Sequence, residues 1–460
     1  MTEQVPAPAA TAPQVVHLVS PNIPADQGLS SLGLLLQLAG SLSAAFACFT
    51  GFLWLWASVW MGGGAMIGIL LIGTLSVIRS FMHRAAGTEL LYGPQPLRGV
   101  RRYAVVGLAH SVLLAALLMS PLYHVPVRSS VAIGVACAVW PVLLLLLLRL
   151  PRFRRYEEEL PLSEDKGFEG AAVLMTILGL AGLGVGSSIL WSMLHTAGSV
   201  RGLGALLVLV VGLLVIRSVV HVRAGLGGLS DTPLDLAAER AGNYATLGIV
   251  SALITSAVMF LTVVGSRADF SAILAIAVIG WVLAAWPMIL RRYFAERQFA
   301  SLLAGNDAPV HRRAPDAGLT ALGWLLIGAG GAQASLAVLG VLGGASDLRV
   351  ISSLLPASDG SAWIAALIAV AHVGAGFELV RMSPHHRAVV TGVGGITLLL
   401  QLSALWPTWR QLARFGSLDP AVVATLGMAL VPMVTGGAMI ALVQRKLTPM
   451  ARASIRSARR

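Results

Sequence analysis

Long apolar runs separated by short polar segments make up most of this chain. An α-helix needs roughly 20 apolar residues to cross a bilayer. The runs therefore predict an all-α integral membrane protein with about twelve transmembrane helices. The predicted helices cover residues 32–60, 62–83, 103–121, 129–149, 169–197, 202–222, 242–265, 269–290, 317–343, 361–381, 387–407 and 419–444. The segments between them are too short to hold a separate soluble domain.

The same sequence markers return along the chain at a long, regular interval. Trp140-Pro141, late in the fourth run, is matched by Trp286-Pro287 in the eighth and Val431-Pro432 in the twelfth, with the prolines 146 and 145 residues apart. A His-x-x-Ala-Gly marker also recurs three times in the same order, at residues 83–87, 221–225 and 372–376. An interval of this length corresponds to a whole domain, so the pattern predicts one four-helix unit that occurs three times.

These markers divide the chain into three membrane repeats and two tails. Each repeat holds an even number of helices, so successive repeats enter the membrane from the same side and are parallel. Parallel repeats are related by an axis along the membrane normal. The predicted repeats are residues 32–150, 169–292 and 317–446, between a disordered cytoplasmic tail at 1–31 and a basic cytoplasmic tail at 447–460.

Basic residues are concentrated in one set of loops. Of the 32 Lys and Arg residues, 24 lie in the C-terminal tail or in loops after even-numbered helices, and six lie in loops after odd-numbered helices. Arg79 and Arg217 lie near the inner ends of the second and sixth helices. The asymmetry follows the positive-inside rule and predicts that both termini are cytoplasmic. The expected contacts of the arginine clusters are the anionic headgroups of the lipid bilayer, not nucleic acid.

Composition narrows the functional classes further. The chain is 57% hydrophobic and 11% charged, whereas a soluble domain carries about 25% charged residues. The preference for Arg over Lys, with abundant Ala, Gly and Val, is typical of a GC-rich bacterial genome and predicts the bacterial inner membrane. Cys48 and Cys137 have no second ligand nearby, so neither a disulfide framework nor a metal site is expected. No catalytic or cofactor motif is present, and we expect neither an enzyme nor a cofactor.

A proline lies inside the fourth helix of each predicted repeat: Pro141, Pro287 and Pro432. Proline removes one backbone hydrogen bond from a helix and so leaves a carbonyl without its partner. The carbonyls concerned belong to Cys137, Leu283 and Met428. In hydrocarbon each of them needs another partner. We expect a kink that shapes each bundle, and a hinge or a carbonyl-lined site is the alternative.

The histidine of each marker is the second polar feature of the repeats. His83 and His221 each follow an arginine by four residues at the predicted cytoplasmic end of a helix, where long basic side chains reach the headgroups. In the third repeat Ile368 replaces the arginine, and the predicted helix starts later, which places His372 near mid-membrane. Glu378 lies in the same helix. A charged group in the bilayer needs a partner or a water-filled cavity, so His372 and Glu378 form the candidate polar membrane site, with a structural role as the alternative.

Two functions fit this pattern. The first is a transporter or permease for a small or lipophilic solute, which the repeats and the prolines favour. The second is a non-catalytic membrane scaffold or assembly subunit, which explains the short loops and the nearly uniform apolar character without any site. A polar cavity that joins two repeats would favour the first, and apolar packing between repeats would favour the second.

Overall fold

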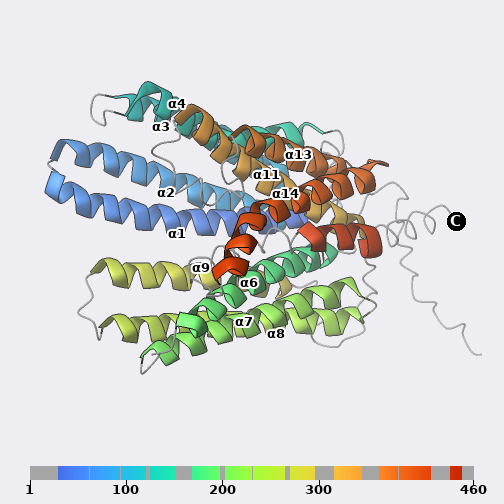
Figure 1. Cartoon of the computed structure of the whole chain (residues 1–460). Helices are drawn as coiled ribbons and strands as arrows, with labels where there is room; N and C mark the ends of the chain where they lie inside the picture. Colours follow the sequence, from blue (N-terminus) through green and yellow to red (C-terminus); the bar gives the residue numbers. More distant parts are fainter. Residues whose placement is uncertain are drawn as a thin grey trace, which may run out of the picture.

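The computed structural model of the chain describes residues 29–61, 63–93, 95–120, 125–150, 153, 168–196, 203–230, 232–264, 270–295, 315–343, 362–381, 383–415 and 436–447. Within these ranges the chain forms eleven α-helices and one π-helix, without any strand (Figure 1). The helices are α1 Leu29–Met61, α2 Gly63–Tyr92, α3 Pro96–Met119, α4 Val127–Leu148, α6 Phe168–Thr196, α7 Leu203–Leu229, α8 Leu234–Val264, α9 Phe270–Phe294, α11 Pro315–Gly343, α13 Ala362–Val380, α14 His386–Phe415 and η2 Leu442–Leu447. Residues 436–441 are helical and continue into η2.

Eight helices in the described residues are long and apolar enough to cross a membrane. They belong to α1, α3, α4, α6, α7, α8, α9 and α11. The apolar parts of α13 and α14 within the described residues are shorter, at residues 366–380 and 386–400. The structure thus confirms an all-helical chain whose helices suit a multi-pass membrane protein.

Five predicted helix ends are wrong by seven to nine residues, and one of them is the end of α14, which continues to Phe415. Helix α2 continues to Tyr92 and α3 begins at Pro96, while α7 continues to Leu229 and α8 begins at Leu234. Hydropathy marks the part of a helix that can lie in hydrocarbon, whereas these helices continue past their apolar runs. The added turns are amphipathic and bury apolar side chains, Leu90, Leu97 and Val100 among them.

The helices pack in chain order within three groups, which we call bundles. The first bundle is α1–α4, the second is α6–α9, and the third is α11, α13, α14 and residues 436–447 (Figure 1). The first helix of each bundle also contacts the first helices of the other two. In addition, α1 packs against α9 and α11 packs against α4. The three first helices therefore join the bundles.

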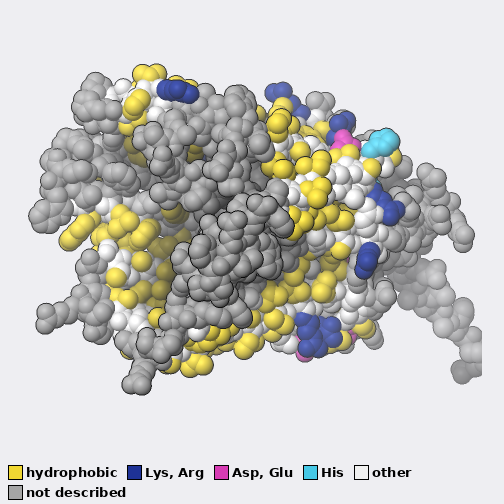
Figure 2. Space-filling model, viewed as in Figure 1, with side chains coloured by type: hydrophobic (Ala, Val, Ile, Leu, Met, Phe, Trp, Pro, Cys, Tyr) yellow, Lys and Arg dark blue, Asp and Glu magenta, His cyan; other side chains and the backbone are white. Residues whose placement is uncertain are grey.

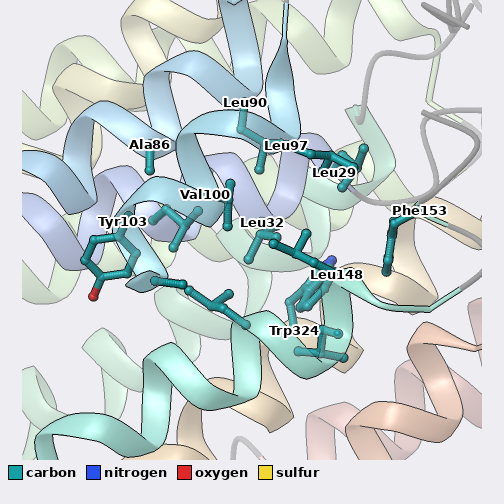
Figure 3. Packing of buried hydrophobic residues seen from close by; sticks show 14 of the residues in the cluster. Leu29, Leu32, Ala86, Leu90, Leu97, Val100, Tyr103, Leu148, Phe153 and Trp324 are labelled. Atoms are coloured by element: carbon teal, nitrogen blue, oxygen red, sulfur yellow. The ribbon is translucent and has the colours of Figure 1, made fainter. Parts of the chain in front are cut away.

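Each bundle has an apolar core that includes residues from the first helix of another bundle. Trp324 of α11 is fully buried in the core of the first bundle, where its ring lies 5.8 Å from that of Phe153 (Figure 3). Leu34 of α1 belongs to the core of the second bundle. Val173 of α6 belongs to the core of the third. Packing between the bundles in the described residues is therefore largely apolar.

The glycine at the end of each His-x-x-Ala-Gly marker lies where the second helix of a bundle meets the first. A Cβ atom there would lie 2.6 Å from a backbone atom of the first helix in all three bundles. The atoms are Gln37 N for Gly87, Thr176 N for Gly225 and Gly323 O for Gly376. Small residues let membrane helices approach closely, and this contact is the physical reason for the glycine in the marker.

The molecular surface is apolar along the helices and basic towards one end. On the described part of the face in Figure 2, hydrophobic side chains are widespread, and most basic groups lie near the end where α7 leads to α8 and α13 leads to α14. Cys48 is exposed on α1, and Cys137 is half-buried on α4. The tails at 1–28 and 448–460, as well as Pro432 and Met428, lie outside the described residues.

Candidate functional site

In the second bundle, the carbonyl that Pro287 frees is bound by an arginine. Pro287 is buried inside α9, and the Nη2 group of Arg217 on α7 donates to the carbonyl oxygen of Leu283 at 2.6 Å. The Nη1 group of the same arginine donates to Oγ of Ser251 on α8 at 3.3 Å. Arg217 is only 9% exposed. Its guanidinium thus replaces the N–H that proline lacks, and a charged donor makes a stronger bond than a neutral one.

The first bundle repeats this arrangement. Pro141 is buried in α4, and Arg79 Nη2 on α2 donates to the carbonyl oxygen of Cys137 at 2.8 Å. Arg79 Nη1 lies 3.1 Å from Nδ1 of His110 on α3. The freed carbonyls were predicted, but the role of the arginines was not. The expectation that Arg79 and Arg217 extend to the headgroups is wrong, because both turn inwards to an otherwise unpaired carbonyl.

The marker histidines lie one turn further along the same helices and contact two aromatic rings. His221 stacks on Tyr244 of α8 with ring centroids 3.9 Å apart, and it receives a hydrogen bond on Nε2 from Trp286 Nε1 at 2.9 Å. In the first bundle His83 stacks on Tyr103 at 4.2 Å and receives a bond from Trp140 Nε1 at 3.3 Å. The indole N–H can only donate, so Nε2 accepts and lacks a proton.

All three marker histidines are buried at a similar distance from a helix end. His83 is nine residues before the end of α2, His221 eight before the end of α7, and His372 eight before the end of α13. The placement of His83 and His221 at the ends of their helices is therefore wrong, because these helices extend past their apolar runs. His372 thus lies no further from the end of its helix than His221 does.

The third bundle differs in what surrounds its histidine. Nδ1 of His372 lies 2.9 Å from Oε1 of Gln333 on α11, and Nε2 lies 3.3 Å from Oγ1 of Thr397 on α14. Glu378 is half-buried in the last turn of α13, and its side chain takes no part in this network. Within the described residues, Glu378 and the nearby Arg381 form no ion pair with each other. The structure therefore places the two predicted site residues on one helix but does not bring them together.

A groove of about 480 Å³ lies along the last three turns of α2. It is lined chiefly by Phe81, Arg84, Ala85, Thr88, Glu89 and Tyr92. The guanidinium of Arg84 lies 5.7 Å from the ring centroid of Trp281 on α9, and that of Arg292 lies 4.9 Å from the ring centroid of Tyr92. The longer α2 creates this groove, so the predicted helix end at residue 83 concealed it.

A smaller pocket of about 210 Å³ lies at the same end of the first bundle. Its lining residues are Arg101, Leu145, Leu148 and Arg149. Unlike those of the groove, its described lining residues include arginines but no carboxylate.

The polar groups of the bundles have the chemistry of structural bonds. Among the described residues, no group of three or more His, Cys, Asp or Glu side chains could hold a metal ion. The buried arginines, tryptophans and histidines described above bond to one another, to hydroxyl or amide side chains, or to backbone carbonyls. Comparisons of the chain with protein-family models, curated proteins and solved structures give no match.

Proposed function

We propose that this chain is a multi-pass membrane protein that acts as a non-catalytic scaffold and assembles other components within the bilayer. The supporting observation is that the buried polar side chains described above bond to other groups of the protein. Arg79 and Arg217 bind carbonyls freed by proline, and His83 and His221 accept bonds from Trp140 and Trp286. Together with the largely apolar packing between bundles, this arrangement supports a rigid frame more than a solute pathway.

The proposal includes three copies of one four-helix unit. The supporting contacts recur in step: arginine to freed carbonyl and histidine to tryptophan in the first two bundles, and glycine at the same close helix contact in all three. We place the chain in the bacterial inner membrane with both termini in the cytoplasm, because basic residues are concentrated in one set of loops. Its arginine clusters then face anionic headgroups.

A scaffold is expected to have a specific protein neighbour in the membrane. A photo-crosslinking amino acid would replace an exposed apolar residue in each bundle, with the fully buried Leu174 as the control position. The exposed positions are Val112, Leu209 and Leu367. We expect a protein adduct of a single mass from at least one exposed position and none from Leu174. The same two chains should then purify as a complex of fixed stoichiometry. Lipid adducts alone at all three positions would overturn the proposal.

A transporter for a small or lipophilic solute is the second candidate, and one observation favours it. His372, Gln333 and Thr397 join three helices of the third bundle through uncharged polar groups. No arginine occupies the place of Arg79 or Arg217, since the matching residue is Ile368. An uncharged polar cluster inside a bundle is the kind of group that can bind a solute.

The substitution His372→Ala separates the two candidates. For a scaffold, we expect it to lower the free energy of unfolding by about 1–2 kcal/mol, because Gln333 and Thr397 lose a buried partner. The uptake of a panel of labelled small solutes into proteoliposomes should stay at the level of empty vesicles for both proteins. His385→Ala, at an exposed position, is the matched control for stability. Uptake by the unsubstituted protein that His372→Ala abolishes at unchanged stability would establish the transporter instead.

A further inference from the structure

We propose that the groove along the last three turns of α2 binds one phospholipid whose headgroup carries a phosphate and a primary amine, as in phosphatidylethanolamine. The proposal requires that the chain spans a bilayer, but it does not depend on the scaffold function. Its basis is the order in which apolar, cationic and anionic side chains follow one another along α2.

The groove has the size and lining of a ligand site. Its volume of about 480 Å³ lies within the roughly 300–1,000 Å³ of small-molecule pockets. Ala85 lies between the larger side chains on this face, and Phe81 at the deep end is 54% exposed. Further down the same helix, Ile78 is also an exposed apolar residue. A lipid acyl chain therefore has an apolar surface to follow below the groove.

The charged residues stand in the order of a phospholipid. From the apolar end, Phe81 is followed by Arg84 and then by Glu89, spaced by about 4.5 Å and about 7.5 Å along the helix axis. A phospholipid presents its chains, its phosphate and its amine in the same order. The guanidinium of Arg84 suits a phosphate because it has several donors in one plane, and the carboxylate of Glu89 suits the ammonium beyond it.

The carboxylate of Glu89 determines which lipid headgroup the groove prefers. That carboxylate fits beside Gly99 at the start of α3, where any side chain would displace it. A carboxylate at this place opposes headgroups with net negative charge, such as phosphatidylglycerol. It favours a primary ammonium, which can donate hydrogen bonds, over the quaternary ammonium of phosphatidylcholine, which cannot. Among the described residues that line the smaller pocket with Arg101 and Arg149, none is a carboxylate, so they give no such basis for selection.

The second and third bundles do not have both an arginine and a glutamate at the positions that match Arg84 and Glu89. Counted from the marker histidine, the places of Arg84 and Glu89 are taken by Val222 and Gly227 in α7, and by Val373 and Glu378 in α13. Only the first of the three copies has both charges. The chain thus contains its own controls, because Glu378 has a carboxylate at the same helix position without the arginine.

Native mass spectrometry of the delipidated full chain tests the proposal directly. The chain is titrated with phosphatidylethanolamine, phosphatidylcholine or phosphatidylglycerol of equal chain length. Phosphatidylethanolamine should bind about tenfold more tightly than the other two, a preference of the size expected for one ion pair. Arg84→Ala should remove most of this binding. Glu89→Gln should remove the preference for phosphatidylethanolamine and raise the affinity for phosphatidylglycerol. Glycerophosphoethanolamine, which has the headgroup but no chains, should not compete.

Two variants at comparable positions serve as controls for the lipid titration. Glu378→Gln and Arg223→Ala, the second at an exposed position on α7, should both bind lipid like the unsubstituted chain. Circular dichroism on each variant checks that it is folded, and Glu89→Gln keeps the shape of its side chain. Equal binding of the three lipids would overturn the proposal, as would binding unaffected by Arg84→Ala. Preference for phosphatidylglycerol in the unsubstituted chain would instead indicate a plain anionic site, and competition by glycerophosphoethanolamine would indicate a soluble ligand.

Discussion

Arg217→Met is expected to lower the free energy of unfolding by about 3 kcal/mol, and Pro287→Ala in the same chain should restore about two-thirds of it. Methionine fills the space of the arginine stem but cannot donate to the carbonyl of Leu283. Loss of a charged hydrogen bond that leaves a buried carbonyl unpaired has a cost of this size. Alanine at position 287 returns a backbone N–H to α9, which can bond to that carbonyl in the ordinary helical way. Unfolding by SDS in mixed micelles, followed by circular dichroism, measures both changes.

The control for this prediction lies on the same helix. Arg223 is exposed on α7, so Arg223→Met should change the free energy of unfolding by less than about 0.5 kcal/mol. The double variant should be more stable than Arg217→Met alone, which gives a double-mutant cycle with a large coupling term. Additive effects of the two substitutions would show that the bond between Arg217 and the freed carbonyl does not hold α7 to α9.

Gly225→Ala is expected to destabilise the protein by about 3 kcal/mol, whereas Gly212→Ala should stabilise it by up to about 1 kcal/mol. At Gly225 the new methyl group would lie 2.6 Å from the backbone nitrogen of Thr176, so α6 and α7 must move apart. Overpacking against a backbone is costly. At Gly212 no atom lies within 4 Å of the new group, so only the better helix propensity of alanine remains.

Gly225→Ala and Gly212→Ala are the same substitution on the same helix. The difference between their effects on stability therefore reports the contact with α6. SDS unfolding of the purified chain in micelles measures both. If the two variants change stability in the same direction, the close contact between α6 and α7 is not the reason for the glycine in the His-x-x-Ala-Gly marker. Gly376→Ala in the third bundle is expected to behave like Gly225→Ala, because its methyl group would meet the carbonyl of Gly323.

The sequence predicted which carbonyls need a partner but not which residue would supply it. A proline offset of four residues identifies Cys137 and Leu283 without any structure. The sequence spacing of Arg79 and His83 also shows that they share a helix face, but not whether that face points to lipid or to α4. That choice depends on how neighbouring helices rotate, which a single helix pattern does not contain. The hydrogen bonds from Trp140 and Trp286 were missed for the same reason.

Helix ends and the candidate site were predicted less well. Hydropathy falls where α2 leaves the apolar zone, so the turns from Arg84 to Tyr92 were assigned to a loop and the groove was overlooked. Burial of Leu90 in the core of the first bundle keeps these turns helical. Glu378 was selected because it is a charge in an apolar run, yet it lies in the last turn of α13. Its counterpart Glu89 carried more information, because Arg84 precedes it in α2, whereas Val373 holds the matching place before Glu378.

Because α1 packs in two bundles, part of its surface has no partner helix until α9 has been synthesised. The indole of Trp281 on α9 donates to the carbonyl of Ser41 on α1 at 3.2 Å, across 240 residues of sequence. At a synthesis rate of about 5–20 residues per second, an α1 inserted in a membrane would wait about 10–50 s before α9 exists. During that time its face around Leu34 has only lipid or a helper protein to cover it. A translation pause or a chain truncated before α9 would therefore leave this face of α1 open to the cell's membrane proteases.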